Sequence, residues 1–183
     1  GYTYVSGRKT RLNDFDSRSS RALVLACAAN SDIEITNCTF AACQDMAIRT
    51  SNSMDGWNVK IEGCQFYDMK DITFPVVALT KTYVEGETYA PSEVLVSGNY
   101  FGVAPNGEAI PIAKGLSVDA EKVTIKDNVF GNILDSVAIN DLGSDDMLVE
   151  SNYFGTDAEG NDQGACGIRI CSIDGELMEM FYP

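Results

Sequence analysis

The sequence predicts an all-β protein, a solenoid of parallel strands with about six coils. Three observations lead to this prediction. A short apolar pattern recurs along the chain, a second strand-like run lies between its copies, and no helix-length periodicity separates them. With 183 residues, 45% of them hydrophobic, the chain can bury one core. We therefore expect a single domain over residues 1–183.

The recurring pattern reads apolar, any, apolar, two polar or small residues, Asn or Cys, any, Phe. Its apolar residues alternate with polar ones, as in a strand with one buried face, and a turn follows each strand. The five copies are 33–40, 59–66, 94–101, 123–130 and 147–154. The pattern therefore predicts one strand and one turn per copy.

A second strand is expected between successive copies. The candidate strands are 22–25, 46–49, 76–79, 115–118, 136–139 and 167–170. Each unit is then strand, turn, strand and loop, and such a unit cannot bury its own apolar face. Stacking the units into a parallel solenoid does bury that face.

One position of the repeat predicts a hydrogen-bonded ladder. An inward Asn at the same turn of neighbouring coils can bond the backbone of that turn and the amide of the next coil. Cysteine replaces asparagine in the first two copies, which predicts a drier ladder at that end. The ladder residues are Cys38, Cys64, Asn99, Asn128 and Asn152.

These repeats resemble those of right-handed parallel β-helix proteins of the pectin-lyase-like superfamily. The segments 99–107 and 152–161 are similar to the Asn-Tyr-Ile-Gly-Thr-Asp-type repeats of microbial surface proteins. The resemblance covers about residues 20–175 and implies a right-handed parallel β-helix. It implies no single activity, because lyases, hydrolases, epimerases, adhesins and phage fibres share this fold.

The two ends of the sequence differ from the repeats. Residues 1–20 are polar, and we expect them to form an N-terminal cap or lead-in. The apolar segment 175–183 looks like the start of a further coil, as in a fragment of a longer surface protein. Open solenoid ends expose strand edges, so end-to-end self-association is the other interpretation.

Charge and composition exclude several classes of partner and chemistry. The formal net charge is -14, so the surface repels phosphate backbones and anionic lipids. The longest apolar run, 22–29, is too short to span a bilayer. We therefore expect no nucleic-acid partner and no membrane insertion. The chain has no histidine, which removes imidazole bases and imidazole metal ligands.

The cysteines leave two interpretations open. An even count is compatible with disulfides, but Cys38 and Cys64 would occupy equivalent positions of adjacent coils. That spacing is slightly too long for an unstrained bridge, so buried free thiols are favoured. The sequence contains no Cys-x-x-Cys pair, so it does not indicate a zinc site. The six cysteines are Cys27, Cys38, Cys43, Cys64, Cys166 and Cys171.

Four residues are candidates for catalysis. Asp145 and Asp146 follow a predicted strand where β-helix hydrolases carry paired aspartates, and glycoside hydrolysis needs two placed carboxylates. The lyases of this fold use Ca²⁺ with a Lys or Arg base, which makes Arg49 and Arg169 candidates. The hydrolase family's Asn-Thr-Asp, Gly-His-Gly and Arg-Ile-Lys motifs are missing. A solvated turn and surface arginines are the favoured explanation of these residues.

One loop is a candidate calcium site. Asp157, Glu159 and Asp162 place oxygen ligands around a glycine turn, although the spacing is not that of an EF-hand. The alternative is a metal-free turn. No cofactor is expected, with Ca²⁺ the one alternative.

Three aromatic residues are candidates for ligand binding. Trp57 lies just before a predicted strand, and Tyr83 and Tyr89 lie in the insertion 81–91. Long loops on a rigid solenoid often carry binding sites, and flat aromatic rings stack on sugars. The alternative is that these rings fold back over the neighbouring coil.

Together these observations favour a non-catalytic β-helix module of a secreted or cell-surface protein. Its expected role is adhesion or carbohydrate binding, with a polysaccharide or another glycan as partner. The first alternative is an enzyme, a polysaccharide lyase or glycoside hydrolase, either complete or truncated. The second is a structural filament or spacer.

Overall fold

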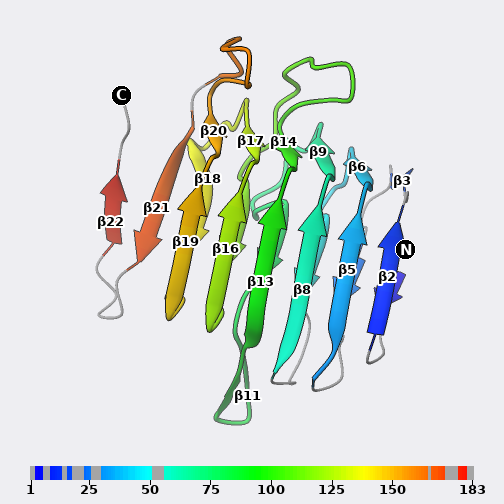
Figure 1. Cartoon of the computed structure of the whole chain (residues 1–183), viewed down its shortest axis with the longest axis vertical. Helices are drawn as coiled ribbons and strands as arrows, with labels where there is room; N and C mark the ends of the chain where they lie inside the picture. Colours follow the sequence, from blue (N-terminus) through cyan, green and yellow to red (C-terminus); the bar gives the residue numbers. More distant parts are fainter. Residues whose placement is uncertain are drawn as a thin grey trace.

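A computed structural model describes residues 3–5, 9–13, 16–17, 23–25, 30–50, 56–164, 166–171 and 177–180. All elements in these ranges are β-strands. Figure 1 shows the long strands side by side, with their colours following the sequence from one end of the stack to the other. Within the described ranges, no helix has the length and apolarity needed to cross a membrane.

Three sheets run along the stack. Sheet A contains β1 (Thr3–Val5), β4 (Leu23–Leu25), β7 (Ile48–Thr50), β10 (Val77–Leu79), β15 (Leu116–Val118), β18 (Val137–Asp141), β21 (Gly167–Cys171) and β22 (Leu177–Met180). Sheet B contains β2 (Lys9–Asn13), β5 (Asp32–Thr36), β8 (Trp57–Glu62), β13 (Pro91–Ser97), β16 (Lys122–Lys126) and β19 (Asp146–Glu150). Sheet C contains β3 (Asp16–Ser17), β6 (Thr39–Ala41), β9 (Gln65–Tyr67), β14 (Tyr100–Phe101), β17 (Val129–Phe130) and β20 (Tyr153–Phe154).

Each coil contributes one strand to each sheet, which gives six complete coils from β1–β3 to β18–β20. Equivalent residues of successive repeats pair in parallel register. In sheet B, Ile33 pairs with Val59, Val59 with Val94, and Val94 with Val123. The five copies of the repeat therefore lie over one another, and the predicted parallel solenoid is confirmed.

The alternation in the sequence determines which side chains form the core. Residues 33, 35, 59 and 61 are buried, whereas the residues between them are only partly buried. The phenylalanine of each repeat also points inward. The rings of Phe40, Phe66, Phe101, Phe130 and Phe154 form one stack, with successive centroids 4.8–5.2 Å apart.

The two ends join the stack in different ways. β1, β2 and β3 pair in parallel with β4, β5 and β6, so this polar stretch supplies the first coil, in the place of the expected cap or lead-in. β22 pairs antiparallel with β21, so Leu177–Met180 folds back along the sheet and does not begin a further coil.

The insertion in the longest repeat forms a hairpin of β11 (Thr82–Val84) and β12 (Glu87–Tyr89). This hairpin projects below the parallel strands in Figure 1. At its base, the Lys81 ammonium lies 2.9 Å from Oδ1 of Asp119 and donates a hydrogen bond to the Gly143 carbonyl. Lys81 therefore ties the insertion to the turns of the next two coils.

Candidate functional site

The predicted ladder is present along the turns between sheets B and C. The Asn99 amide donates to the Ile61 carbonyl, the Asn128 amide to Val96, and the Asn152 amide to Ile125, at 3.0, 3.0 and 2.8 Å. Each side chain thus reaches back to the strand of the preceding coil. This repeated contact secures one coil to the next and satisfies buried backbone groups.

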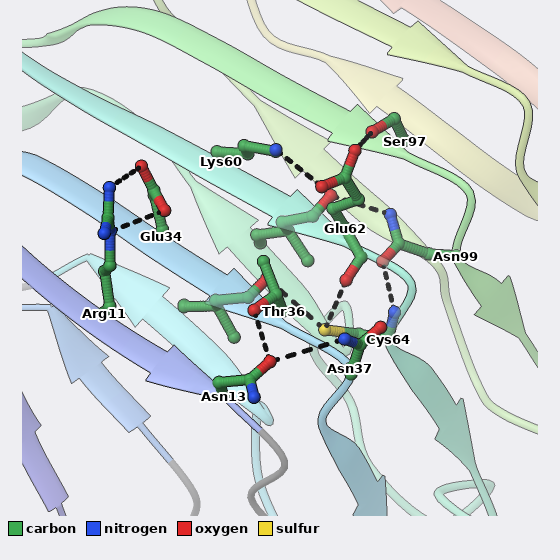
Figure 2. A network of polar contacts seen from close by, with 12 residues as sticks. Arg11, Asn13, Glu34, Thr36, Asn37, Lys60, Glu62, Cys64, Ser97 and Asn99 are labelled. Carbon is green, nitrogen blue, oxygen red and sulfur yellow. Dashed lines mark hydrogen bonds and ion pairs between the residues drawn. The ribbon is translucent and has the colours of Figure 1, made fainter.

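Cysteine takes the same role in the early coils. The Cys64 thiol donates to the Ile35 carbonyl, as Asn99 does to Ile61, and its sulfur accepts the Cys38 N–H at 3.4 Å. Figure 2 shows Cys64 next to Asn99, whose Oδ1 accepts the Cys64 N–H at 2.8 Å. The thiols therefore continue the ladder with weaker donors.

Four cysteines in the described residues are free thiols: Cys38, Cys43, Cys64 and Cys166. This confirms the favoured interpretation for these four, whereas Cys27 and the Cys171 side chain lie outside the described residues. Burial raises the pKa of the Cys43 thiol to about 11, and that of Cys166 likewise to about 11. The hydrogen bond with Cys38, and then burial, raise the pKa of Cys64. The thiols of Cys43, Cys64 and Cys166 are therefore poor nucleophiles at neutral pH.

The two loops that resemble each other in sequence have the same local structure. In loop 102–110 the Gly107 N–H donates to Ala104, and in loop 155–163 the Gly160 N–H donates to Asp157, at 2.9 and 3.0 Å. The second loop is held further by its aspartate. The Asp157 carboxylate accepts hydrogen bonds from Asn161 N and Nδ2, Glu159 N and Gln163 Nε2.

These contacts argue against calcium at this loop. The Asn161 side-chain hydrogen bond is the main cause that lowers the pKa of Asp157. Oδ1 of Asp162 accepts the Gly164 N–H at 2.9 Å. Among the described residues, no three Asp, Glu or Cys side chains are grouped to hold a metal ion. Asp157 and Asp162 therefore serve as hydrogen-bond acceptors within their own loop, which is the arrangement of a metal-free turn.

The predicted aromatic site is not assembled. Trp57 is 4% exposed and belongs to the main core cluster, so its ring cannot stack on a sugar. Its position could have been read from the sequence, because Trp57 lies two and four residues before the inward Val59 and Ile61. Tyr89 is partly buried on β12. The Tyr83 side chain lies outside the described residues.

The four catalytic candidates are spread over two sheets. Arg49 lies on β7 and Arg169 on β21, both at the outward register position of sheet A. The Arg169 side chain lies outside the described residues. Asp145 and Asp146 are exposed where the chain enters sheet B, and Asp146 pairs with Lys122 on that sheet. Arg49 and Arg169 therefore belong to sheet A, whereas Asp146 belongs to sheet B.

Sheet B has a shallow groove of about 260 Å³ on its outer face. Its charged side chains already have partners. Arg11 Nε lies 2.9 Å from Oε2 of Glu34, as Figure 2 shows, and the Lys122 ammonium lies 3.2 Å from Oε1 of Glu93. The Asn58 amide donates to Asp32 at 2.9 Å. These pairs leave the groove few free polar groups for a ligand.

The better candidate site is a pocket of about 300 Å³ on the outer face of sheet A, which we call the sheet A pocket. Ser117 and Asn140 lie on its floor at neighbouring outward register positions of β15 and β18. Phe74, in the loop between β9 and β10, is 54% exposed. The lining residues are Thr73, Phe74, Pro75, Lys114, Leu116, Ser117, Val137 and Asn140.

Lys114 fixes one wall of the sheet A pocket. Its ammonium donates to the Thr73 carbonyl at 2.9 Å and lies 3.5 Å from Oδ2 of Asp135. These contacts hold the loop of Phe74 against the loops of the two following coils. The Asn140 amide donates to Ser117 Oγ at 3.4 Å. The pocket therefore combines an exposed aromatic ring with a hydroxyl, an amide and an ammonium group.

Sequence reasoning missed this pocket. Phe74, Lys114, Ser117 and Asn140 belong to three different coils, and no motif links them. The signal available was the outward position of Ser117 and Asn140 on second strands, next to loops of variable length. The loop that covers Ser117 and Asn140 is determined by the length and path of each loop. The repeat pattern does not encode these properties.

Comparison with known families agrees with this architecture. A family model described as a right-handed β-helix region matches residues 9–171. Searches of curated proteins and of solved structures each found no match. The matched range covers all but the two ends of the chain, including all five repeats and the sheet A pocket. The chain therefore belongs to the right-handed β-helix family.

Proposed function

We propose that this chain is a non-catalytic β-helix module of a secreted or cell-surface protein and that it binds a glycan in the sheet A pocket. The observation that carries the proposal is the exposed ring of Phe74 beside Ser117, Asn140 and Lys114. Sugar rings stack their C–H faces on aromatic side chains, while their hydroxyls need nearby donors and acceptors.

Binding without cleavage is favoured by the placement of the titratable groups. The pocket lining contains no carboxylate and no histidine. Glycoside hydrolysis uses two carboxylates across the scissile bond, and lysines and arginines alone do not supply that pair. Asp145 and Asp146, the candidate pair, lie at the edge of sheet B instead.

The test is a glycan array, followed by titration of the best ligand with pocket variants. We expect Phe74→Ala and Asn140→Ala each to weaken binding about tenfold, since each removes a direct contact. Leu148→Ala is the matched control, because Leu148 is also exposed, at 47%, but lies on sheet B. Equal affinity of wild type and Phe74→Ala would rule out the pocket.

The enzyme alternative is tested in the same series. Incubation with uronate and neutral polysaccharides should release no reducing sugar and no unsaturated product absorbing in the ultraviolet. Turnover that disappears in Arg49→Ala or Asp146→Asn would overturn the non-catalytic assignment. A wild type that binds no glycan at all would favour the structural spacer.

A further inference from the structure

The outer face of sheet C carries two exposed tyrosines at equivalent positions. Tyr100 on β14 pairs with Val129 on β17, and Val129 pairs with Tyr153 on β20. Tyr100 is 41% exposed and Tyr153 is 40% exposed, whereas Val129 between them is 6% exposed. The two tyrosines therefore lie two coils apart, on either side of the buried Val129.

The spacing of these tyrosines is set by the solenoid. Neighbouring strands lie about 4.8 Å apart, so two coils separate the tyrosine positions by about 9.6 Å. An extended β-1,4-linked glycan presents the same ring face once per disaccharide, a repeat of nearly this length. The rigid stack thus spaces two exposed, amphipathic side chains at about the interval between alternate sugars of one chain.

The lack of charged residues on this face favours a neutral glycan. The exposed or partly exposed outward residues of sheet C from β6 to β20 are Thr39, Gln65, Tyr100 and Tyr153, whereas Ala41, Tyr67 and Val129 are buried, the first two in a cluster with Ala104. None of them is charged, although the chain has a net charge of -14. An acidic polymer would be repelled by the surrounding protein and would find no cation on this face, whereas a neutral polymer meets no such penalty.

We propose that Tyr100, Val129 and Tyr153 form a second binding site, here called the tyrosine face, for a neutral, extended β-1,4-linked polysaccharide that runs parallel to the solenoid axis. Alternate sugar rings stack on Tyr100 and Tyr153. The intervening ring lies over Val129, and Gln65 and Thr39 offer hydrogen bonds to sugars further along. The site is independent of the sheet A pocket, which lies on another sheet.

The experiment uses hydroxyethylcellulose in native affinity gels, and cellobiose and cellohexaose in calorimetric titrations. The wild type should be retarded by hydroxyethylcellulose and should bind cellohexaose more tightly than cellobiose, because only the longer chain reaches both tyrosines. Tyr100→Thr and Tyr153→Thr should each lower the affinity for cellohexaose about fivefold. Threonine keeps the β-propensity of the strand, so the variants should stay folded.

The double variant is decisive. With both tyrosines replaced, cellohexaose should bind no better than cellobiose, while polygalacturonate should not compete for the wild type. A wild type that is not retarded by hydroxyethylcellulose overturns the tyrosine face, as does a double variant that keeps its affinity for cellohexaose.

Phe74→Ala separates the two sites. Unchanged cellohexaose binding by Phe74→Ala supports the tyrosine face, whether or not the sheet A pocket binds a glycan. Loss of cellohexaose binding in Phe74→Ala but not in the tyrosine variants overturns the tyrosine face and leaves the proposed function intact. A third outcome is that the tyrosine variants lose cellohexaose binding while Phe74→Ala still binds the array ligand as the wild type does. That outcome supports the tyrosine face and rules out the sheet A pocket as a glycan site.

Discussion

Asn99 and Asn128 form the central step of the ladder inside the solenoid. The backbone N–H and the side-chain amide of Asn99 both donate to Oδ1 of Asn128, at 2.9 Å each, and both residues are fully buried. The Asn128 amide in turn donates to Oδ1 of Asn152 at 2.8 Å. A chain of amide dipoles thus runs along the solenoid, and each member depends on the next.

Replacing Asn128 should lower the free energy of unfolding substantially. Asn128→Ala leaves the Asn99 N–H and the Val96 carbonyl without this partner in a dry interior, and the Asn99 amide keeps only its bond to Ile61, so we expect a loss of roughly 3 kcal/mol in the free energy of unfolding. Urea denaturation followed by circular dichroism measures it. Asn152→Ala is the control and should cost roughly 1 kcal/mol, because Asn152 is only partly buried. Equal losses would contradict the ladder's role in the core.

The cysteine positions should accept asparagine. In Cys64→Asn the new amide can donate to Ile35 and its oxygen can accept the Cys38 N–H, as Asn99 does one coil later. We expect stability within about 1 kcal/mol of wild type, whereas Cys64→Ala should lose about 2 kcal/mol by leaving both groups unpaired. The same urea titration compares them. A Cys64→Asn variant less stable than Cys64→Ala would show that the thiol is required by packing.

Substitutions in the phenylalanine stack should lower the stability of the protein most at the centre of the stack. Phe101 is fully buried, with its ring centroid 4.8 Å from those of both Phe66 and Phe130. Phe101→Leu removes two ring contacts and changes the shape of the site, so we expect a loss of about 2 kcal/mol. Phe154→Leu, at the partly buried end of the stack, should cost less than half as much. Thermal unfolding of the two variants decides whether position in the stack matters.

A glycine permits close approach of two coils. A Cβ on Gly115 would lie 2.1 Å from the Ala138 carbonyl oxygen, so β15 and β18 must move apart in Gly115→Ala. We expect a loss of at least about 3 kcal/mol, measured by urea denaturation. Gly107→Ala is the control: its φ of +81° strains an alanine, but nothing lies within 4 Å. That variant should lose only about 1 kcal/mol.

Much of the fold is encoded locally and could be predicted. The period-2 alternation of Val59 and Ile61 fixes the buried face, and the Asn or Cys two residues before each Phe fixes the turn. Because each coil contacts mainly its neighbours, the repeated pattern sets the register of the stack. The ladder followed from one repeated position, and the structure contains it with Cys64 in place of asparagine.

The sites depend on contacts that the repeat does not encode. Phe74 and Asn140 line the same pocket only because the loop that carries Phe74 reaches across the outer face of sheet A toward later coils. Trp57 is buried rather than exposed because it shares the inward parity of Val59 and Ile61 on β8. Arg49 and Asp146 belong to different strand sets, and how far apart their side chains lie depends on the length of each connection, which the repeat does not encode.

The buried thiols predict a loss of stability at alkaline pH. Burial raises the pKa of Cys43 from its ordinary 9.0 to about 11. Between these values the unfolded chain releases a proton that the folded chain retains, so the free energy of unfolding should fall as the pH rises from about 9 to 11. Tyrosines and lysines titrate in the same range, so the wild type is compared with Cys43→Ala in urea titrations at pH 8 and pH 10.5. The variant should lose less stability than the wild type over this interval, by on the order of 1 kcal/mol. Identical losses in the two proteins would show that Cys43 ionises equally in the folded and unfolded chains.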